Sequence, residues 1–308
     1  MKSLNPYMRQ PPPDYWERPY LAFDPAVSPH YEVVLVPLVL GSFQRHLEEQ
    51  DDTAPDQPEP ETETEWPPAL YETRAFSSAT GRWEARSFPR EGDDRAGTIT
   101  TAYMRRDRDF GFHDMHNAVY RRGALYVHGQ MNLFYKFSLA NGTYRVIRPP
   151  AGLVPSSPDA VTRQQVYLGR WKGWVSCAAV DDFFRLRVWT LDESAPPAAA
   201  GHSNEWVLKH QNDLRRIVLP SPAVHDDDDE FLTFLGFHPF QDIVFFNRSL
   251  QRGLAYDLGT TTVQDLGDMF PKDYGSGNMN YAEIRASFPY TPFWMQNSLP
   301  TAHADDVP

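Results

Sequence analysis

Residues 76–84 (FSSATGRWE) and 137–145 (FSLANGTYR) align without a gap, and this repeated motif decides the fold class. Both copies have Phe, Ser, Ala and Gly at matching positions, and aromatic Trp83 corresponds to aromatic Tyr144. The Thr-Gly and Asn-Gly pairs suit a tight turn, since glycine tolerates positive φ. We therefore predict that each motif is a β-hairpin whose two aromatic side chains pack across antiparallel strands.

Longer strings repeat in the same way. YLAFDPAVSPHYEVVLV (20–36) is similar to FLGFHPFQDIVFF (234–246), and both RVWTLDE (187–193) and LAYDLGT (254–260) repeat the aromatic, Ser/Thr/Asp, Leu step of KFSLANG (136–142). The runs are short, rich in Val, Tyr, Phe and Trp, and bounded by Gly, Pro and Asn, which favours strands. A repeat of roughly 50 to 65 residues is typical of kelch-like propeller blades that carry loop insertions.

The repeats predict an all-β protein, namely a β-propeller of kelch-like four-stranded antiparallel blades. The domain spans residues 20–297, with blades at about 20–88, 98–148, 164–211 and 231–266 and a closing segment at 280–297. A Pro-rich segment (1–19) precedes it, and a tail expected to be disordered (298–308) follows it. Propellers close rings of four to eight blades. Four units either close a small ring or form part of an incomplete larger propeller, and we favour the incomplete propeller.

The net charge of −12 comes from two local stretches rather than from the whole chain. Residues 48–65 and 225–230 (HDDDDE) are strongly acidic and together exceed that imbalance. An acidic, Pro-rich stretch without apolar residues cannot offset its ordering entropy, so we expect residues 41–65 to form a disordered loop within the first blade. A second insertion is expected at 194–204. No basic, aromatic-interleaved stripe indicates nucleic acid, and no run is long enough to span a membrane.

Metal, cofactor and thiol chemistry find little support in the chain. His113 and His116 have a spacing used by helical metal pairs, but they lie in an expected loop without a third ligand. The run 226–229 lacks the Gly and terminal Glu of an EF-hand loop. Cys177 is the sole cysteine and lies in an apolar setting, which predicts a buried, unreactive thiol and a reducing compartment. We expect no metal and no cofactor.

An enzyme is the alternative class. Asp181, Asp182 and Asp257 could supply the carboxylate pair of a glycosidase-like propeller. The hairpin motif is also similar to the Asp-box of sialidase propellers, but Ala79 occupies the diagnostic aspartate position. Since no nucleophile elbow, phosphate-binding loop or dinucleotide fingerprint occurs, we predict no catalytic residues and no enzymatic activity.

One cluster of side chains suggests a binding site. The string GRWKGW (169–174) brings together two cations and two tryptophans: Arg170, Trp171, Lys172 and Trp174. Such a cluster could anchor a protein partner at an exposed surface. The alternative, which we favour, is a hairpin whose tryptophans pack within or between blades.

The ordered strings also resemble a known family. YLAFDPAVSPHYEVVLVP, EWPPALYETRAFSSATGRWEARSFPREG, NAVYRRGALYVHG, YRVIRPP and the closing FPYTPFWMQ look like the C-terminal β-propeller of the large grass family of F-box proteins, over most of residues 19–297. The resemblance implies a plant protein that serves as substrate receptor of an SCF-type ubiquitin ligase. In such receptors the F-box binds a Skp1-like adaptor, the propeller presents a target protein, and other subunits catalyse ubiquitin transfer.

The chain departs from that pattern because no helical F-box segment is recognisable in it. We therefore expect a protein-binding propeller that contacts the adaptor only if an F-box is supplied upstream, with an unknown target protein as its partner. The expected location is the cytoplasm, the nucleus or both, without nucleic-acid or membrane partners. Besides an enzyme, a non-functional fragment is the remaining alternative.

Overall fold

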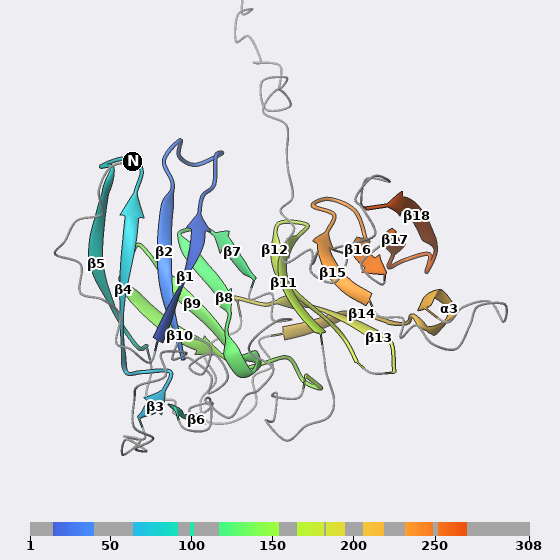
Figure 1. The fold of residues 1–308 in the computed structure, drawn as a ribbon, viewed down its shortest axis with the longest axis horizontal. Helices are drawn as coiled ribbons and strands as arrows, with labels where there is room; N and C mark the ends of the chain where they lie inside the picture. The colour runs from blue at the N-terminus through green and yellow to red at the C-terminus, as the bar shows by residue number, and fades with distance from the viewer. Residues whose placement is uncertain are drawn as a thin grey trace, which may run out of the picture.

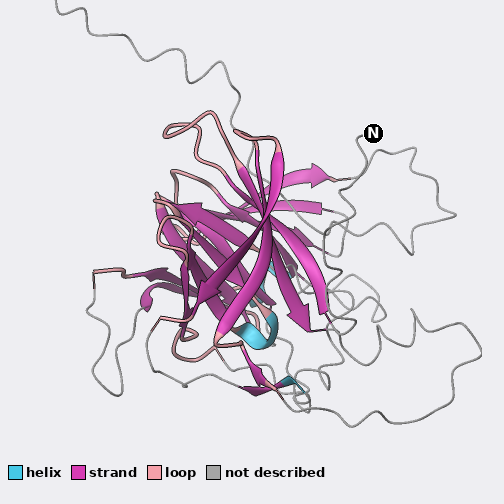
Figure 2. Ribbon diagram, turned by 90° about the vertical axis from the view of Figure 1, so that its left-hand side faces the viewer, coloured by secondary structure: helices cyan, strands magenta, loops and turns pink. Residues whose placement is uncertain are grey.

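The protein is described by a computed structural model that covers residues 15–39, 64–91, 99–101, 117–153, 165–181, 183–194, 206–218, 232–248 and 252–269. These residues form four antiparallel four-stranded sheets with almost no helix (Figure 1; strands are magenta in Figure 2). The predicted all-β, blade-like architecture of a β-propeller is therefore confirmed. The predicted closing segment at 280–297 lies outside the described residues.

Each sheet is an antiparallel meander whose strands follow chain order, and only the first sheet skips a strand, β3. The first sheet contains β1 (Tyr15–Ala22), β2 (Glu32–Val39), β4 (Leu70–Ser77) and β5 (Arg82–Pro89). The second contains β7 (Ala118–Arg121), β8 (Ala124–His128), β9 (Phe134–Ser138) and β10 (Thr143–Ile147). The third contains β11 (Gln165–Trp171), β12 (Trp174–Val180), β13 (Arg185–Leu191) and β14 (Trp206–Asp213). The fourth contains β15 (Leu232–Phe237), β16 (Ile243–Arg248), β17 (Arg252–Asp257) and β18 (Val263–Asp268).

Smaller elements lie outside these sheets. The strands β3 (Glu65–Trp66) and β6 (Ile99–Thr100) pair with each other. A 3-10 turn, η1 (Gln130–Asn132), joins β8 to β9, and the short helix α3 (Arg215–Val218) follows β14. The loop predicted at 41–65 falls between β2 and β4 in the chain; it lies outside the described residues except for its last two, of which Glu65 begins β3.

The two copies of the opening motif are β-hairpins. Phe76 pairs with Trp83 across β4 and β5, with ring centroids 5.5 Å apart. Phe137 pairs with Tyr144 across β9 and β10, and these rings stack at 5.6 Å. The glycine of each motif has a positive φ, 65° in the first and 64° in the second. The predicted turn chemistry and cross-strand aromatic packing are both confirmed.

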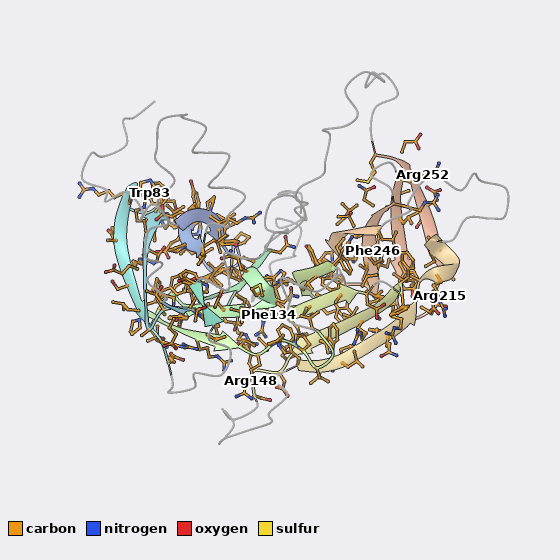
Figure 3. All side chains as sticks on the ribbon, turned by 60° about the horizontal axis from the view of Figure 1, so that its bottom comes forward. Trp83, Phe134, Arg148, Arg215, Phe246 and Arg252 are labelled. Carbon is orange, nitrogen blue, oxygen red and sulfur yellow. The ribbon has the colours of Figure 1, made fainter. Side chains whose placement is uncertain are left out.

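The four sheets follow one another along an arc. Contacts between sheets connect the first to the second, the second to the third, and the third to the fourth, and most of them involve the first strands β1, β7, β11 and β15. These first strands therefore form the inner edge of the arc, as in a propeller. Figure 3 shows the first and fourth sheets at opposite ends of the arc, marked by Trp83 and by Arg252.

The hydrophobic core lies between the sheets. One cluster joins the first and second sheets around Tyr71, whose ring centroid lies 5.3 Å from that of Phe137. Another joins the second and third sheets, where Trp206 packs 5.4 Å from Phe134. A further cluster joins the third and fourth sheets. Because each sheet is apolar on both faces, its burial depends on neighbours on either side.

Candidate protein-binding surface

The hairpin loops of the described sheets are here called the hairpin face. It consists of the loops that join first to second strands (residues 23–31, 122–123, 172–173 and 238–242) and third to fourth strands (78–81, 139–142 and 258–262). In an antiparallel meander these loops emerge at the same end of a sheet. Within the first sheet, the Tyr31 N–H donates to Ser78 Oγ at 2.7 Å, and the Ser78 N–H donates to the Tyr31 carbonyl at 2.9 Å.

Hydrogen bonds also tie the loops of neighbouring sheets together. Arg121 Nε, at the end of β7, donates to the Gly173 carbonyl of the third sheet at 2.8 Å. The Lys172 N–H donates to the Pro239 carbonyl of the fourth sheet at 3.1 Å. One bond joins the second sheet to the third, and the other joins the third to the fourth. The loops at 122–123, 172–173 and 238–242 are therefore fixed relative to one another.

The predicted tryptophan hairpin lies on this face, but Trp171 is not exposed. Its ring is 5% exposed and stacks on Phe237 of β15, with centroids 6.1 Å apart. Its indole N–H donates to the Gln241 carbonyl at 2.9 Å. Trp171 therefore packs between the third and fourth sheets, which is the packing role that the sequence favoured for the tryptophans of this hairpin.

Lys172 and the adjacent glycine form the two-residue turn between β11 and β12. Both have positive φ, 49° for Lys172 and 78° for the glycine, as a type I′ hairpin requires. Lys172 Nζ pairs with Asp242 at 2.6 Å and lies 5.2 Å from the Trp171 ring centroid. The lysine thus joins the loops of the third and fourth sheets. Arg170 precedes the turn and is exposed.

Trp174 is the member of the cluster that presents an aromatic surface. Its side chain is 47% exposed. The guanidinium of Arg121 lies 5.0 Å from its ring centroid, although Arg121 itself is buried. A cation held against one part of the ring orients the indole while leaving much of it free for a partner. Trp174 is therefore an aromatic anchor positioned between the second and third sheets.

A carboxylate that the sequence did not single out fixes this arrangement. Glu193 Oε1 accepts a hydrogen bond from Lys136 Nζ at 3.0 Å, and Glu193 also pairs with Arg121 and accepts from the Tyr126 hydroxyl. Burial alone would raise the pKa of Glu193, but the hydrogen bonds from Tyr126 and Lys136 and the nearby cations lower it. A charged Glu193 therefore holds the buried guanidinium that orients Trp174.

Other apolar side chains are exposed on the same face. The side chains of Phe240 and Val27 are 78% and 80% exposed, and Tyr31 is 40% exposed. Phe23 packs edge-on against Tyr31, with centroids 6.3 Å apart. Exposed aromatic groups on a hydrogen-bonded scaffold are typical of protein-binding surfaces. Phe23 belongs to the repeated Phe-Asp/His-Pro step of the sequence, but nothing in that step indicates that its side chain is exposed.

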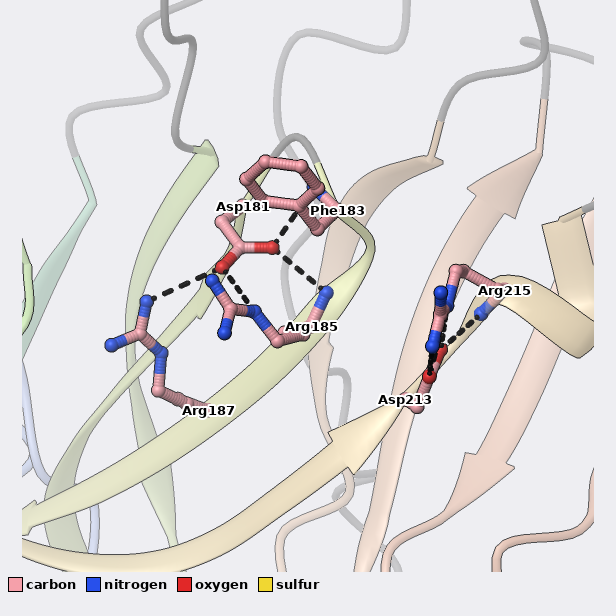
Figure 4. A network of polar contacts seen from close by, with 6 residues as sticks. All are labelled: Asp181, Phe183, Arg185, Arg187, Asp213 and Arg215. Atoms are coloured by element: carbon pink, nitrogen blue, oxygen red, sulfur yellow. Dashed lines mark hydrogen bonds and ion pairs between the residues drawn. The ribbon is translucent and has the colours of Figure 1, made fainter.

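Two of the carboxylates considered for catalysis, Asp181 and Asp257, accept hydrogen bonds within turns. Asp181, in the loop between β12 and β13, pairs with Arg185 Nε at 2.9 Å and with Arg187 at 3.5 Å (Figure 4). It also accepts from the backbone N–H groups of Phe183 and Arg185, each at 3.0 Å. Nearby, Asp213 pairs with Arg215 within its own turn (Figure 4).

Asp257 has a comparable role in the fourth sheet. Its Oδ1 accepts from the N–H groups of Gly259 and Thr260 at 2.9 and 2.8 Å, which caps the β17–β18 turn. Asp182 lies outside the described residues, as do His113, His116 and the run 226–229. Within the described part of the chain, no group of three or more His, Cys, Asp or Glu side chains is placed to hold a metal ion.

The cysteine lies in the core, and the described helices bear on a membrane span. Cys177 is fully buried in β12, and burial raises the pKa of its thiol. The helices in the described ranges are all too short or too polar to cross a membrane.

The fold and the hairpin face together define a class, an all-β protein of propeller-like sheets with an exposed aromatic surface. No family model matches the chain, and no curated protein matches it either.

Proposed function

We propose that this chain is a protein-binding module that resembles the substrate-recognition domain of F-box proteins in SCF-type ubiquitin ligases. The observation that carries the proposal is the exposed ring of Trp174, held by a buried Arg121 at the junction of two sheets. A large aromatic group that is fixed before binding loses little conformational entropy when a partner covers it.

The other features of the hairpin face support a protein partner rather than a small molecule. Phe240 is exposed on the loop before β16 and Trp174 at the start of β12, and Lys172 joins the two loops beside them, so the partner would contact both sheets. Protein interfaces are enriched in aromatic residues at their centre and depend on a few such anchors. The polar loop backbones around these side chains would form the rim of the interface.

In the ligase context, the module would present its bound target for modification by other subunits. Contact with a Skp1-like adaptor would come from an F-box supplied upstream in the same polypeptide. The proposed location is the cytoplasm, the nucleus or both, where such complexes act, in a plant cell. Catalysis would belong to the other subunits, so the chain would act without cofactor or metal.

A site-specific cross-linking experiment tests the binding face. A photoreactive phenylalanine is placed at Phe240 or, as a control, at Leu266, which is 51% exposed on β18 away from the hairpin face. We expect defined protein adducts at position 240 and none at 266. Equal labelling at both positions would show that the hairpin face has no special role.

The partner identified by cross-linking then allows a quantitative test. We expect Trp174→Ala to weaken binding about tenfold or more, in line with a hot-spot residue, while Leu266→Ala leaves the affinity unchanged. The ligase role is tested separately by joining an F-box to the chain and adding adaptor and ligase subunits. Ubiquitin transfer to the partner should occur and should fall in the Trp174→Ala variant. Binding without transfer would retain the binding module and reject the receptor role.

A further inference from the structure

In three of the sheets, a row of side chains that runs across the four strands packs against the sheet that comes before it in the chain. Each row contains one residue from each of the four strands, matched by register. In the second sheet the row is Tyr120, Leu125, Phe137 and Tyr144. In the third it is Leu168, Cys177, Trp189 and Leu208. In the fourth it is Phe237, Val244, Tyr256 and Val263.

These rows are interfaces between sheets. Phe137 and Tyr144 are fully buried in the cluster shared with the first sheet. Cys177 and Trp189 lie in the cluster shared with the second sheet, and Tyr256 lies in the cluster shared with the third. The row of a sheet therefore faces the sheet that comes before it in the chain.

The first sheet carries the same row, and within the described residues no sheet lies in front of it. Register places Leu21, Val33, Phe76 and Trp83 side by side across its four strands. The alternating residues Tyr20, Val34 and Ala75 point the other way, into the core with the second sheet. Leu21 is 57% exposed, whereas its counterparts on the first strands of the third and fourth sheets, Leu168 and Phe237, are 1% and 5% exposed. In Figure 3, Trp83 lies at the outer end of the arc.

The arginine on this outer face is already paired with an acidic side chain. Arg74 lies beside Phe76 on the same side of β4, and its Nε donates to Glu17 Oε1 at 3.2 Å, within an ion pair. Covering the face would therefore bury an existing ion pair. Burying a pair has a much smaller free-energy penalty than burying an isolated charge. An apolar row beside a satisfied ion pair is suited to packing against another sheet.

The fourth sheet has the complementary face at the other end of the arc. Phe245 is partly exposed and pairs with Ala255 and Gly236, and these residues point away from the third sheet because they alternate with Val244 and Phe246. In the first three sheets, the corresponding side is the one that receives the row of the following sheet. Asn247 and Ala255 on this side are already buried within the chain, so Phe245 is the apolar residue of this face that a partner sheet would cover.

We propose that two copies of this chain associate head to tail, with the outer face of the fourth sheet of each copy packed on the Leu21–Trp83 row of the other. The occupant is a second copy because this chain carries both halves of the interface at opposite ends of one arc. Two arcs of four sheets contain eight sheets, which is within the range of closed propellers. A twofold arrangement buries both ends equally and closes the ring, so assembly stops at two copies.

The first test is the mass of the full chain in solution. Analytical ultracentrifugation should give a dimer that dissociates on dilution. Leu21→Glu and Phe245→Glu each place a charge in the interface, and each should raise the dissociation constant of the dimer at least a hundredfold. Val207→Glu, at an exposed position on β14 of the third sheet and away from both ends of the arc, should leave the dimer intact. A wild-type monomer at all concentrations, including one whose own C-terminal residues cover the row, would overturn the proposal.

Mixing the two charged variants tests the head-to-tail geometry. The Leu21→Glu chain keeps a normal fourth sheet, and the Phe245→Glu chain keeps a normal first sheet, so a mixture should form dimers through one intact interface although neither variant dimerises alone. A dimer that pairs two first sheets would show no such recovery, and that result would overturn the proposal. Unchanged circular dichroism and thermal unfolding show that each variant is folded.

A cross-linking measurement provides a readout that does not depend on disruptive variants. Cys177 is buried, so introduced cysteines can be labelled selectively. A chain with Leu21→Cys and a second chain with Phe245→Cys should be joined by a short bis-maleimide when mixed. Exclusive joining of two Leu21→Cys chains to each other would contradict the head-to-tail arrangement.

Discussion

The side-chain amide of Gln130 forms hydrogen bonds with both backbone groups of Val39. Its Nε2 donates to the Val39 carbonyl and its Oε1 accepts from the Val39 N–H, each at 2.8 Å. Val39 ends β2 in the first sheet, whereas Gln130 lies in the turn after β8 in the second. Both residues are 1% exposed, so the amide replaces a neighbouring strand at a buried sheet boundary.

Removing this amide should destabilise the protein strongly. Gln130→Ala leaves a buried N–H and a buried C=O without partners, so we expect the free energy of unfolding to fall by about 2–4 kcal/mol. Urea unfolding monitored by fluorescence measures the change. Gln264→Ala is the matched control, because Gln264 is exposed on β18 and should change stability by less than about 0.5 kcal/mol. Equal effects of the two variants would show that the Gln130 amide contributes little.

His128 should make stability depend on pH. Burial lowers the pKa of His128 to about 4, while its hydrogen bond with Asn132 Oδ1 partly opposes this and the charge of Arg18 adds to it. The unfolded chain therefore binds the proton more readily between about pH 6.5 and 4. The contribution of a neutral His128 is complete above about pH 6.5 and is lost as the pH falls towards 4.

The variant His128→Gln isolates this contribution. It cannot take up a proton, so its free energy of unfolding should fall less steeply than that of the wild type between pH 7.5 and 4. The difference in slope should integrate to on the order of 3 kcal/mol. Urea unfolding at several pH values measures both curves, and parallel curves would show that His128 is not the group responsible.

The sequence predicted the elements that depend on neighbouring residues along the chain. The repeated hairpin could be recognised because its glycine turn and its paired aromatics lie within nine residues, as in 76–84. The Gln130–Val39 and Arg121–Glu193 contacts join residues 91 and 72 positions apart, so no local pattern indicates them. Only the packing of whole sheets brings these groups together.

The tryptophan hairpin shows the same limit. Trp171 and Trp174 are partners across the β11–β12 turn, and the sequence offers no reason to treat them differently. Their environments differ because Trp171 meets Phe237 of the fourth sheet, whereas Trp174 meets Arg121 of the second.

This difference should be measurable as stability. Trp171→Ala removes a buried ring and leaves a cavity, so we expect a loss of about 3–5 kcal/mol in the free energy of unfolding. Trp174→Ala removes a half-exposed ring and one cation–π contact, and should cost about 1 kcal/mol or less. Thermal and urea unfolding of the two variants provide the comparison. A large loss at Trp174 would indicate packing rather than an anchor available to a partner.

The β17–β18 turn is a third copy of the hairpin turn, but a threonine takes the place of the glycine. The Thr261 N–H donates to the Asp257 carbonyl at 2.9 Å, just as the Gly81 N–H donates to the Ser77 carbonyl at 2.8 Å. Thr261 has a φ of 57°, a left-handed conformation that costs a β-branched residue about 1–2 kcal/mol. Thr261→Gly removes this strain, although it gives the unfolded chain more freedom.

We expect Thr261→Gly to raise the free energy of unfolding by about 0.5–1 kcal/mol, the difference between the strain removed and the entropy added. The reverse change, Gly81→Thr, should lower it by about 1–2 kcal/mol. A Cβ at Gly81 would meet no heavy atom within 4 Å, so that loss would come from the backbone conformation and not from a clash. Urea unfolding of both variants measures the two changes, and a stability unchanged in Gly81→Thr would mean that the turn relaxes out of the left-handed region.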